Sequence, residues 1–251
     1  MTGFSFDLTG RTALVTGASS GLGARFGRIL AAGGANVALG ARRADRLAAL
    51  AAEIGPRAAA VQMDVAREAD IIAGFDEADA IFGKVDTVIA NAGVDGAGMA
   101  TTISEDEIEA TLAINLKGAI LTAREGAKRM MAQGVTNGRI VLIASITATE
   151  PSPGLVAYAA SKAGVVQAGR TLAREWARAG INVNTVSPGY IRTAINDAWF
   201  DTEPGKKQIA KFPKRRLMGE EGLDAMMLFL CSDASEFVTG TNFVLDDGQT
   251  L

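Results

Sequence analysis

Three side chains between positions 145 and 162 have the chemistry to move a proton together. Tyr158 and Lys162 stand four residues apart among good helix formers, so a helix would place both on one face. Ser145 follows the apolar run 140–144, which is typical of a buried strand. A strand end and a helix face can meet in one small volume, and the spacing therefore predicts that these three residues form a cluster.

The chemistry of such a cluster follows from its residue types. A tyrosine has an ordinary pKa of about 10, which is too high for an efficient base near neutral pH. We expect the Lys162 cation to lower the pKa of Tyr158, so that the phenol can exchange a proton with a carbonyl or alcohol oxygen held by Ser145. A tyrosine and a lysine at this spacing are more often ordinary residues of a surface helix, so the rest of the chain has to decide.

The composition narrows the classes of protein to consider. The 251 residues, 48% of them hydrophobic, suffice for one large α/β domain, and the net charge of −3 does not favour a nucleic acid as partner. The absence of histidine argues against a His-based catalytic triad and against a metal site. The single cysteine, Cys231, and the lack of a signal-peptide pattern or a membrane-length apolar run predict a cytoplasmic protein with no membrane partner.

A glycine-rich loop joins the first predicted strand, 12–16, to a helical pattern that begins at Leu22. A tight glycine turn lets the backbone approach a pyrophosphate, and the free N–H groups of a helix N-terminus favour its negative charge. We therefore expect residues 17–23, the glycine loop, to bind a dinucleotide; the alternative is a plain tight turn. The candidate contacts are Gly17, Ser19, Ser20, Gly21, Leu22 and Gly23.

The end of the second predicted strand, 36–40, bears on which dinucleotide binds. An acidic residue there holds the ribose hydroxyls of NAD, whereas an arginine suits the 2′-phosphate of NADP. The strand runs into Ala41, Arg42 and Arg43, with no acid. We expect NADP(H) to be preferred, mainly through Arg42, with NAD(H) as the alternative. Both arginines could instead be solvated at a helix start, which is the simpler interpretation for Arg43.

Strand and helix patterns alternate along the rest of the chain. Further strands are expected at 58–62, 86–90, 139–144, 181–186 and 242–245, and helices at 46–54, 71–82, 104–131 and 223–230, the third opening with a Ser104–Glu107 capping box. The alternation predicts a single α/β domain over residues 1–251: a Rossmann-type, doubly wound parallel sheet of about seven strands with helices on both faces. Residues 94–102 and 193–216 are long excursions. We expect the first to be mobile and the second to be a substrate lid.

Together these motifs resemble the classical short-chain dehydrogenase/reductase family, including its 3-oxoacyl-(acyl-carrier-protein) reductase-like and its ketone- or alcohol-reducing members. The resemblance covers nearly the whole chain, from about Leu8 to the end. The family's motifs are matched by residues 16–23, Asp64-Val65, Asn91-Ala92-Gly93, Asn115, Ser145, Tyr158, Lys162, Pro188-Gly189, Ile191 and Thr193. One departure is Ser20, because a basic residue is frequent at that place in the family's loop.

The resemblance implies hydride transfer between a nicotinamide cofactor and a ketone, secondary alcohol or 3-oxoacyl substrate. Tyr158 would be the acid or base, Lys162 would lower its pKa and hold the nicotinamide ribose, and Ser145 would steady the substrate oxygen. Asn115 would position a water that relays protons to Lys162. Besides the glycine loop and the two arginines, the implied cofactor contacts are Asp64, Val65, Asn91, Ala92, Gly93, Tyr158, Lys162, Pro188, Gly189, Ile191 and Thr193.

The substrate pocket and the partners are predicted less directly. Apolar or aromatic residues would line the pocket and favour a ketone, alcohol or 3-oxoacyl group over a sugar: Ile146, Thr147, Leu155, Tyr190, Trp199 and Phe200. Proteins that resemble this one are commonly homotetramers. Two other classes stay open, an epimerase or dehydratase with a bound cofactor and a cofactor-sensing protein without turnover. The short tail and the glycine spacing disfavour the first class, and the retained Tyr158 disfavours the second.

Overall fold

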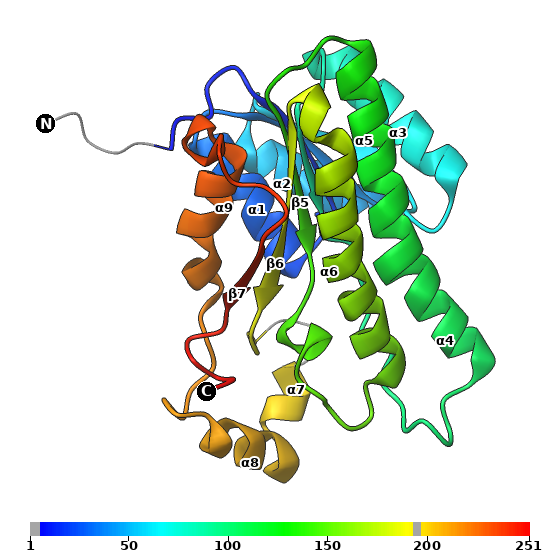
Figure 1. Cartoon of the computed structure of the whole chain (residues 1–251), viewed down its shortest axis with the longest axis vertical. Coiled ribbons are helices and arrows are strands. Elements are labelled where there is room, and N and C mark those ends of the chain that lie inside the picture. The colour runs from blue at the N-terminus through cyan, green and yellow to red at the C-terminus, as the bar shows by residue number, and fades with distance from the viewer. Residues whose placement is uncertain (1–5, 193–196) are drawn as a thin grey trace, which may run out of the picture.

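The computed structural model describes residues 6–192 and 197–251, and within them seven strands form one parallel sheet (Figure 1). The strands are β1 (Thr12–Thr16), β2 (Asn36–Ala41), β3 (Ala58–Gln62), β4 (Thr87–Ala90), β5 (Gly138–Ile143), β6 (Ile181–Pro188) and β7 (Asn242–Leu245). Their order across the sheet is β3-β2-β1-β4-β5-β6-β7, with every neighbouring pair parallel. The predicted sheet is confirmed, with strand ends displaced by at most two residues.

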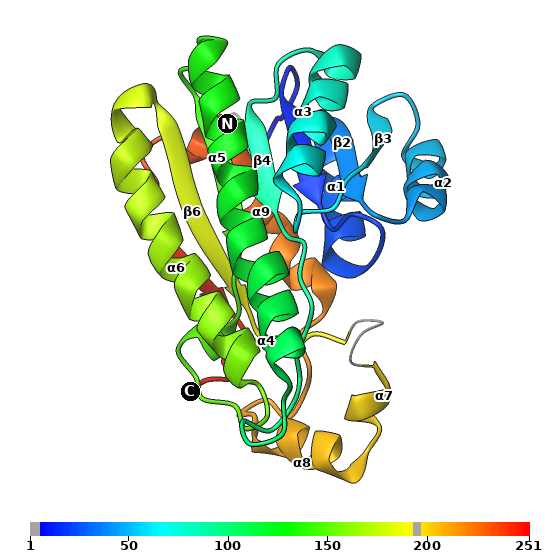
Figure 2. The same cartoon turned by 90° about the vertical axis from the view of Figure 1, so that its right-hand side faces the viewer.

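Helices cover both faces of this sheet (Figures 1 and 2). The α-helices are α1 (Gly21–Ala32), α2 (Ala44–Ile54), α3 (Glu68–Phe82), α4 (Glu105–Leu112), α5 (Ala119–Ala132), α6 (Val156–Trp176), α7 (Asp197–Phe200), α8 (Glu203–Lys211) and α9 (Asp224–Cys231). The 3₁₀ turns are η2 (Ile146–Ala148), η3 (Ala177–Ala179), η4 (Glu220–Leu223) and η5 (Asp233–Ser235). In the part of the chain that the structure describes, no helix has the length and apolar character needed to cross a membrane.

Two hydrophobic cores lie on opposite faces of the sheet, because side chains alternate along each strand. Val15 of β1 belongs to the core that contains Phe26 of α1, whereas its neighbour Leu14 belongs to the core that contains Phe75 of α3. Strands buried on both faces appear in a sequence as continuous apolar runs. This explains why the strands were recognisable from the sequence without an alternating pattern.

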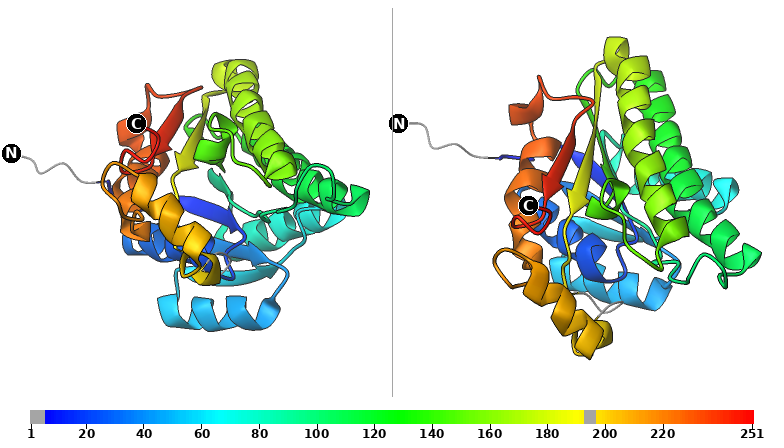
Figure 3. Two further views of the ribbon diagram at one scale, coloured as in Figure 1. Left: turned by 90° about the horizontal axis from the view of Figure 1, so that it is seen from below. Right: turned by 60° about the horizontal axis from the view of Figure 1, so that its bottom comes forward.

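The carboxyl ends of the strands lie at one edge of the sheet. At this edge the chain leaves β1 toward β2, which pairs with one side of β1, while β4 pairs with the other side. Ligands of doubly wound sheets bind at such a switch point. Thr16 joins the two strands there, because its Oγ1 accepts hydrogen bonds from the N–H groups of Asn91 (3.0 Å) and Ala92 (3.1 Å). In Figure 3, the view from below faces this edge, and α8 lies across it.

The predicted helix 104–131 is present but is not uniformly α-helical. It opens with the predicted Ser104–Glu107 capping box and then changes at Ala113–Gly118 to a π-helical turn, η1, before α5 continues it. Such turns insert a residue into the helix and re-aim side chains, frequently at functional sites. Asn115 lies in this turn and is buried.

Candidate active site

The structure brings Ser145, Tyr158 and Lys162 together at the end of β5. Ser145 caps η2: its Oγ accepts hydrogen bonds from the Thr147 N–H at 3.2 Å and the Thr147 hydroxyl at 3.0 Å. The Lys162 Nζ donates to the carbonyl oxygen of Ile143 at 2.8 Å and lies 5.5 Å from the centre of the Tyr158 ring. The helix face and the strand end thus converge as their spacing predicted.

Burial controls the charges of this cluster. It raises the pKa of Tyr158 above its ordinary value, while hydrogen bonding by Ser145 lowers that pKa and the Asp95 carboxylate raises it. Burial also lowers the pKa of Lys162 to about 8. The expectation of a lowered Tyr158 pKa was therefore wrong for this structure. The physical reason is that the phenol loses its hydration, while the ammonium group of Lys162 donates to a backbone carbonyl.

Asn115 ties the π-helical turn to the loop after β4. Its Oδ1 accepts from the Val94 N–H at 2.8 Å, and its Nδ2 donates to the Val94 carbonyl at 2.9 Å and to Ser161 Oγ at 3.2 Å. Ser161 in turn donates to the Tyr158 carbonyl at 2.6 Å. The Asn115 side chain is therefore engaged with protein groups, and the water implied for it stays a prediction.

The glycine loop has the shape that a dinucleotide requires. A Cβ built on Gly17 would lie 2.8 Å from Ala92 Cα, and one built on Gly23 would lie 2.6 Å from Asn91 Nδ2, so neither position admits a side chain. Ser20 precedes α1 without capping it, and the first turn of α1 holds no acidic residue. The N–H groups of this helix end are thus left for an anion, and the residues present fit a pyrophosphate.

The motif after β4 connects this cradle to the catalytic cluster. A Cβ on Gly93 would lie 3.2 Å from Asn115 Oδ1 and 3.7 Å from Lys162 Nζ, so Gly93 borders both residues directly. Asn91 donates through Nδ2 to the Thr16 carbonyl at 3.0 Å. The glycine loop, the loop after β4 and the Tyr158 cluster therefore form one continuous surface at the switch point.

The two arginines after β2 are both exposed at the surface. Arg43, for which a solvated side chain was the simpler interpretation, donates to Ser19 Oγ from Nε (3.0 Å) and Nη2 (2.7 Å), and to Ser20 Oγ at 2.8 Å. Arg42 is exposed, and its carbonyl accepts from Gln62. The serine hydroxyls hold the Arg43 guanidinium against the glycine loop. Arg43 therefore places a positive charge beside Ser20, the position where a basic residue is frequent in the family.

The other predicted contacts lie around this surface. Asp64 Oδ1 accepts from the Ala66 N–H at 3.0 Å, and Val65 is buried against η1, where a Cβ on Gly118 would lie 2.9 Å from its Cγ2. Pro188 ends β6, the Gly189 N–H donates to the Leu245 carbonyl at 2.9 Å, and Ile191 bridges to Met218. Thr193 lies outside the described residues.

The aromatic residues predicted for the substrate pocket form a chain of ring contacts. The Tyr190 ring stacks on Phe212 at 5.6 Å and meets Phe200 edge-on at 6.1 Å, and Trp199 packs on Phe200 at 5.0 Å. Phe200 is buried, whereas Trp199 is 42% exposed. The Tyr190 hydroxyl lies 3.3 Å from Ser152 Oγ, in the loop that precedes α6. Ile146, Thr147 and Leu155 lie in or beside η2 and the start of α6.

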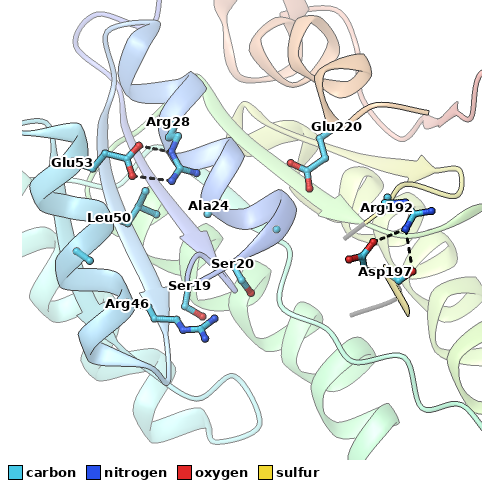
Figure 4. A pocket seen from close by; sticks show the side chains of 12 residues that line it. Ser19, Ser20, Ala24, Arg28, Arg46, Leu50, Glu53, Arg192, Asp197 and Glu220 are labelled. Carbon is cyan, nitrogen blue, oxygen red and sulfur yellow. Dashed lines mark hydrogen bonds and ion pairs between the residues drawn. The ribbon is translucent and has the colours of Figure 1, made fainter. Parts of the chain in front are cut away.

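A cavity of about 620 Å³ lies beside the glycine loop and not at Tyr158 (Figure 4). Ser19 and Ser20 form its middle, with the Arg28–Glu53 ion pair on one side and the Arg192–Asp197 ion pair on the other. Arg46 also lines it. Its position extends the phosphate end of the cofactor cradle.

Two residues that help to build this site were not recognised as functional from the sequence. Ser161 carries a local signal, since it is next to the motif residue Lys162. Gln249 bonds to Tyr190 from the far end of the chain and carries none.

Fold and site together define a nucleotide-binding oxidoreductase domain. A family model described as enoyl-(acyl carrier protein) reductase matches residues 17–250. The D-threitol dehydrogenase of Mycolicibacterium smegmatis is 38% identical over 99% of this chain and 96% of its own length. The structure of a gluconate 5-dehydrogenase from Burkholderia cenocepacia with NADP and tartrate has a TM-score of 0.92 at 32% identity, covering 98% of this chain and 97% of that one. A 3-ketoacyl-(acyl-carrier-protein) reductase from Brucella melitensis with NADH has a TM-score of 0.89 at 31% identity, covering 98% and 100%.

The chain belongs to the short-chain dehydrogenase/reductase family. It is an NAD(P)-dependent oxidoreductase that acts on alcohol or ketone groups. These relatives do not favour the epimerase, dehydratase or sensing alternatives.

Proposed function

We propose that Tyr158 is the acid/base of a reversible alcohol–ketone conversion. The observation that carries this proposal is the buried Lys162 ammonium 5.5 Å from the Tyr158 ring, beside the Ser145 hydroxyl. A nicotinamide cofactor would supply or accept the hydride when bound. Ser145 holds the substrate oxygen, and Tyr158 gives that oxygen a proton in reduction or removes it in oxidation.

The charge states favour reduction near neutral pH. Burial keeps the Tyr158 phenol protonated, which is the form that donates a proton. Lys162, with a pKa of about 8, is predominantly protonated near neutral pH and stabilises the phenolate that the donation leaves behind. Oxidation starts from the phenolate and therefore becomes faster as pH rises.

The test is the Tyr158→Phe variant, which keeps the ring and removes the hydroxyl. Turnover should fall by about 100-fold or more, because general acid–base catalysis contributes on that order. Thermal stability and cofactor binding should stay near wild type, which separates loss of chemistry from loss of fold. Near-normal turnover would remove Tyr158 from the mechanism.

NADP(H) is the preferred cofactor in this proposal, and Arg43 joins Arg42 in selecting it. The Arg43 guanidinium already lies on the hydroxyls of Ser19 and Ser20, at the phosphate end of the cradle. A planar arginine donates charge-assisted hydrogen bonds to a phosphate. Arg43 would thus replace the basic residue that the glycine loop lacks.

The substrate we favour is a small polyol or the corresponding hydroxyketone. The hydroxyls of Ser152 and Tyr190 lie 3.3 Å apart beside the catalytic segment, and the names of the threitol and gluconate relatives point to the same class. This departs from the apolar pocket expected from the sequence. A screen of polyols, simple ketones and 3-oxoacyl thioesters, read by nicotinamide absorbance, should give its highest kcat/KM with a polyol pair; a 3-oxoacyl thioester in first place would overturn this choice.

Three further predictions belong to the same proposal. Residues 193–216 would act as the lid, and α7 and α8 lie in this segment at the lower end of the molecule (Figure 1). A homotetramer would cover exposed apolar surface on two sides. One is the groove lined by Leu112, Leu116 and Ile120, and the other is the β7 edge with the exposed Phe237 and Val244. We retain a cytoplasmic location because the thiol of Cys231 is free and buried.

A further inference from the structure

The C-terminal turn closes on the backbone of Tyr190. The Tyr190 N–H donates to Gln249 Oε1 at 2.6 Å, and Gln249 Nε2 donates to the Tyr190 carbonyl at 3.0 Å. One side-chain amide thus satisfies both polar backbone groups of a residue 59 positions away. Gln249 is itself only 9% exposed.

This arrangement is built into the fold and is not a loose tail lying on the surface. A Cβ on Gly189 would lie 2.6 Å from Gln249 Oε1 and 2.7 Å from Asp246 Cα, so position 189 has no room for a side chain. The Asp246 carboxylate holds the turn in shape, because it accepts from the Gly248 and Thr250 N–H groups and from the Thr250 hydroxyl at 2.6 Å.

The same turn also holds the far end of the lid segment. Asp247 accepts from Arg216 Nε at 2.6 Å and pairs with Lys214. The Tyr190 ring stacks on Phe212, and the Tyr190 hydroxyl lies within hydrogen-bonding distance of Ser152. The last residues of the chain therefore connect the exit of β6, the lid segment and the loop before Tyr158.

We propose that Gln249 is a positioning residue for substrate binding, which acts by fixing the Tyr190 hydroxyl beside Ser152. This inference rests on the proposed function, since it takes Tyr190 to be a substrate contact. The Gln249 amide offers one acceptor and one donor at the reach seen here. The hydride and proton steps depend on other residues, so Gln249 governs KM more than kcat.

Three substitutions separate these effects. Gln249→Met keeps the length of the side chain and removes both hydrogen bonds, whereas Gln249→Glu keeps the acceptor and loses the donor. Leu251→Ala is the matched control from the same turn, because Leu251 is 96% exposed. With the best substrate of the screen, Gln249→Met should raise KM by about 2- to 10-fold with kcat nearly unchanged, because the displaced Tyr190 hydroxyl loses its hydrogen bond to the substrate. Gln249→Glu should be intermediate, and Leu251→Ala should match wild type.

A double-mutant cycle shows whether the effect passes through Tyr190. In a Tyr190→Phe background the hydroxyl is absent, so Gln249→Met should add little to KM. A second measurement needs no substrate: in a Trp176→Phe background, the remaining Trp199 reports on the ring chain through Phe200 and Tyr190. Gln249→Met should change its emission, and Leu251→Ala should not.

The inference is overturned if Gln249→Met leaves both KM and Trp199 emission unchanged, or if its effect on KM is equally large with and without the Tyr190 hydroxyl. It is also overturned if the variant lowers kcat and thermal stability with KM unchanged, which is the result of a merely structural role. Tyr158→Phe is assayed in parallel to separate failure of this inference from failure of the proposed function. If the proposed function is wrong, Tyr158→Phe stays active; if only the role of Gln249 is wrong, Tyr158→Phe is still inactive.

Discussion

Asn115 holds both polar backbone groups of Val94, accepting from its N–H at 2.8 Å and donating to its carbonyl at 2.9 Å. Its remaining amide hydrogen goes to Ser161, the neighbour of Lys162 in sequence. One side chain in a π-helical turn thereby fixes the loop that borders Lys162 through Gly93. This is an organising role for Asn115 that is independent of any water.

Asn115→Ala should both destabilise the protein and slow it. The change leaves the two backbone groups of Val94 without partners, at a cost of about 1–3 kcal/mol for each group that stays buried. We expect turnover to fall by at least about 10-fold, because Gly93 and Lys162 lose their fixed relation. Lys117→Ala is the control, since Lys117 is an exposed residue of the same turn. Urea unfolding and steady-state kinetics measure the two effects, and equal losses in both variants would refute the role.

Lys162 should make stability depend on alkaline pH. Its folded pKa of about 8 lies below its ordinary value of 10.5, so the unfolded chain binds the extra proton between these limits. The resulting penalty is fully present below pH 8 and is relieved as pH rises toward 10.5. Lys162→Met should therefore have a higher free energy of unfolding than wild type near neutral pH. The gain is up to about 3 kcal/mol, minus the contribution of the hydrogen bond to the Ile143 carbonyl, which the variant loses. This advantage should disappear near pH 10.5.

The measurement is urea unfolding of both proteins across this pH range. Lys84→Met, at an exposed position, is the matched control and should show a constant difference from wild type. A stability difference for Lys162→Met that does not change with pH would contradict the prediction.

Asp95 and Ser145 should move the pH dependence of alcohol oxidation in opposite directions. The Asp95 carboxylate raises the pKa of Tyr158, so Asp95→Asn should shift the rising limb of kcat/KM to lower pH. Hydrogen bonding by Ser145 lowers that pKa, so Ser145→Ala should shift the limb to higher pH, along with a lower rate. pH–rate profiles of the two variants test this, and shifts of the same sign would exclude Tyr158 as the group observed.

Arg43→Ala and Arg42→Ala should each weaken NADPH selectively. A lost charge-assisted hydrogen bond costs about 1.5–3 kcal/mol, which corresponds to roughly 10- to 150-fold in affinity. NADH should change little, because it carries no 2′-phosphate. Arg57→Ala is the control, since Arg57 donates to the Gly34 carbonyl away from the loop. Direct binding of both cofactors and kcat/KM measure the effect; a wild-type protein with higher kcat/KM for NADH than for NADPH would end the proposal.

Much of the fold could be predicted because its signals are local. The strands of the buried sheet are continuous apolar runs, the glycine loop needs its residues at fixed places, and one helical turn sets Tyr158 beside Lys162. The capping box at Ser104 was recognisable for the same reason. These features depend on a few consecutive residues, and tertiary contacts did not change them.

The tertiary structure decided whatever depends on partners distant in sequence. The π-helical turn at Asn115 follows the same apolar pattern as an α-helix, and its side-chain bonds to Val94 and Ser161 form only between segments distant in sequence. The direction of the Tyr158 pKa shift depends on how far the packed structure removes the phenol from water. The role of Gln249 could not be predicted from the sequence, because its two hydrogen bonds join the end of the chain to the distant residue Tyr190. Local sequence determines which groups are available, whereas desolvation and long-range hydrogen bonds arise only when distant segments pack together.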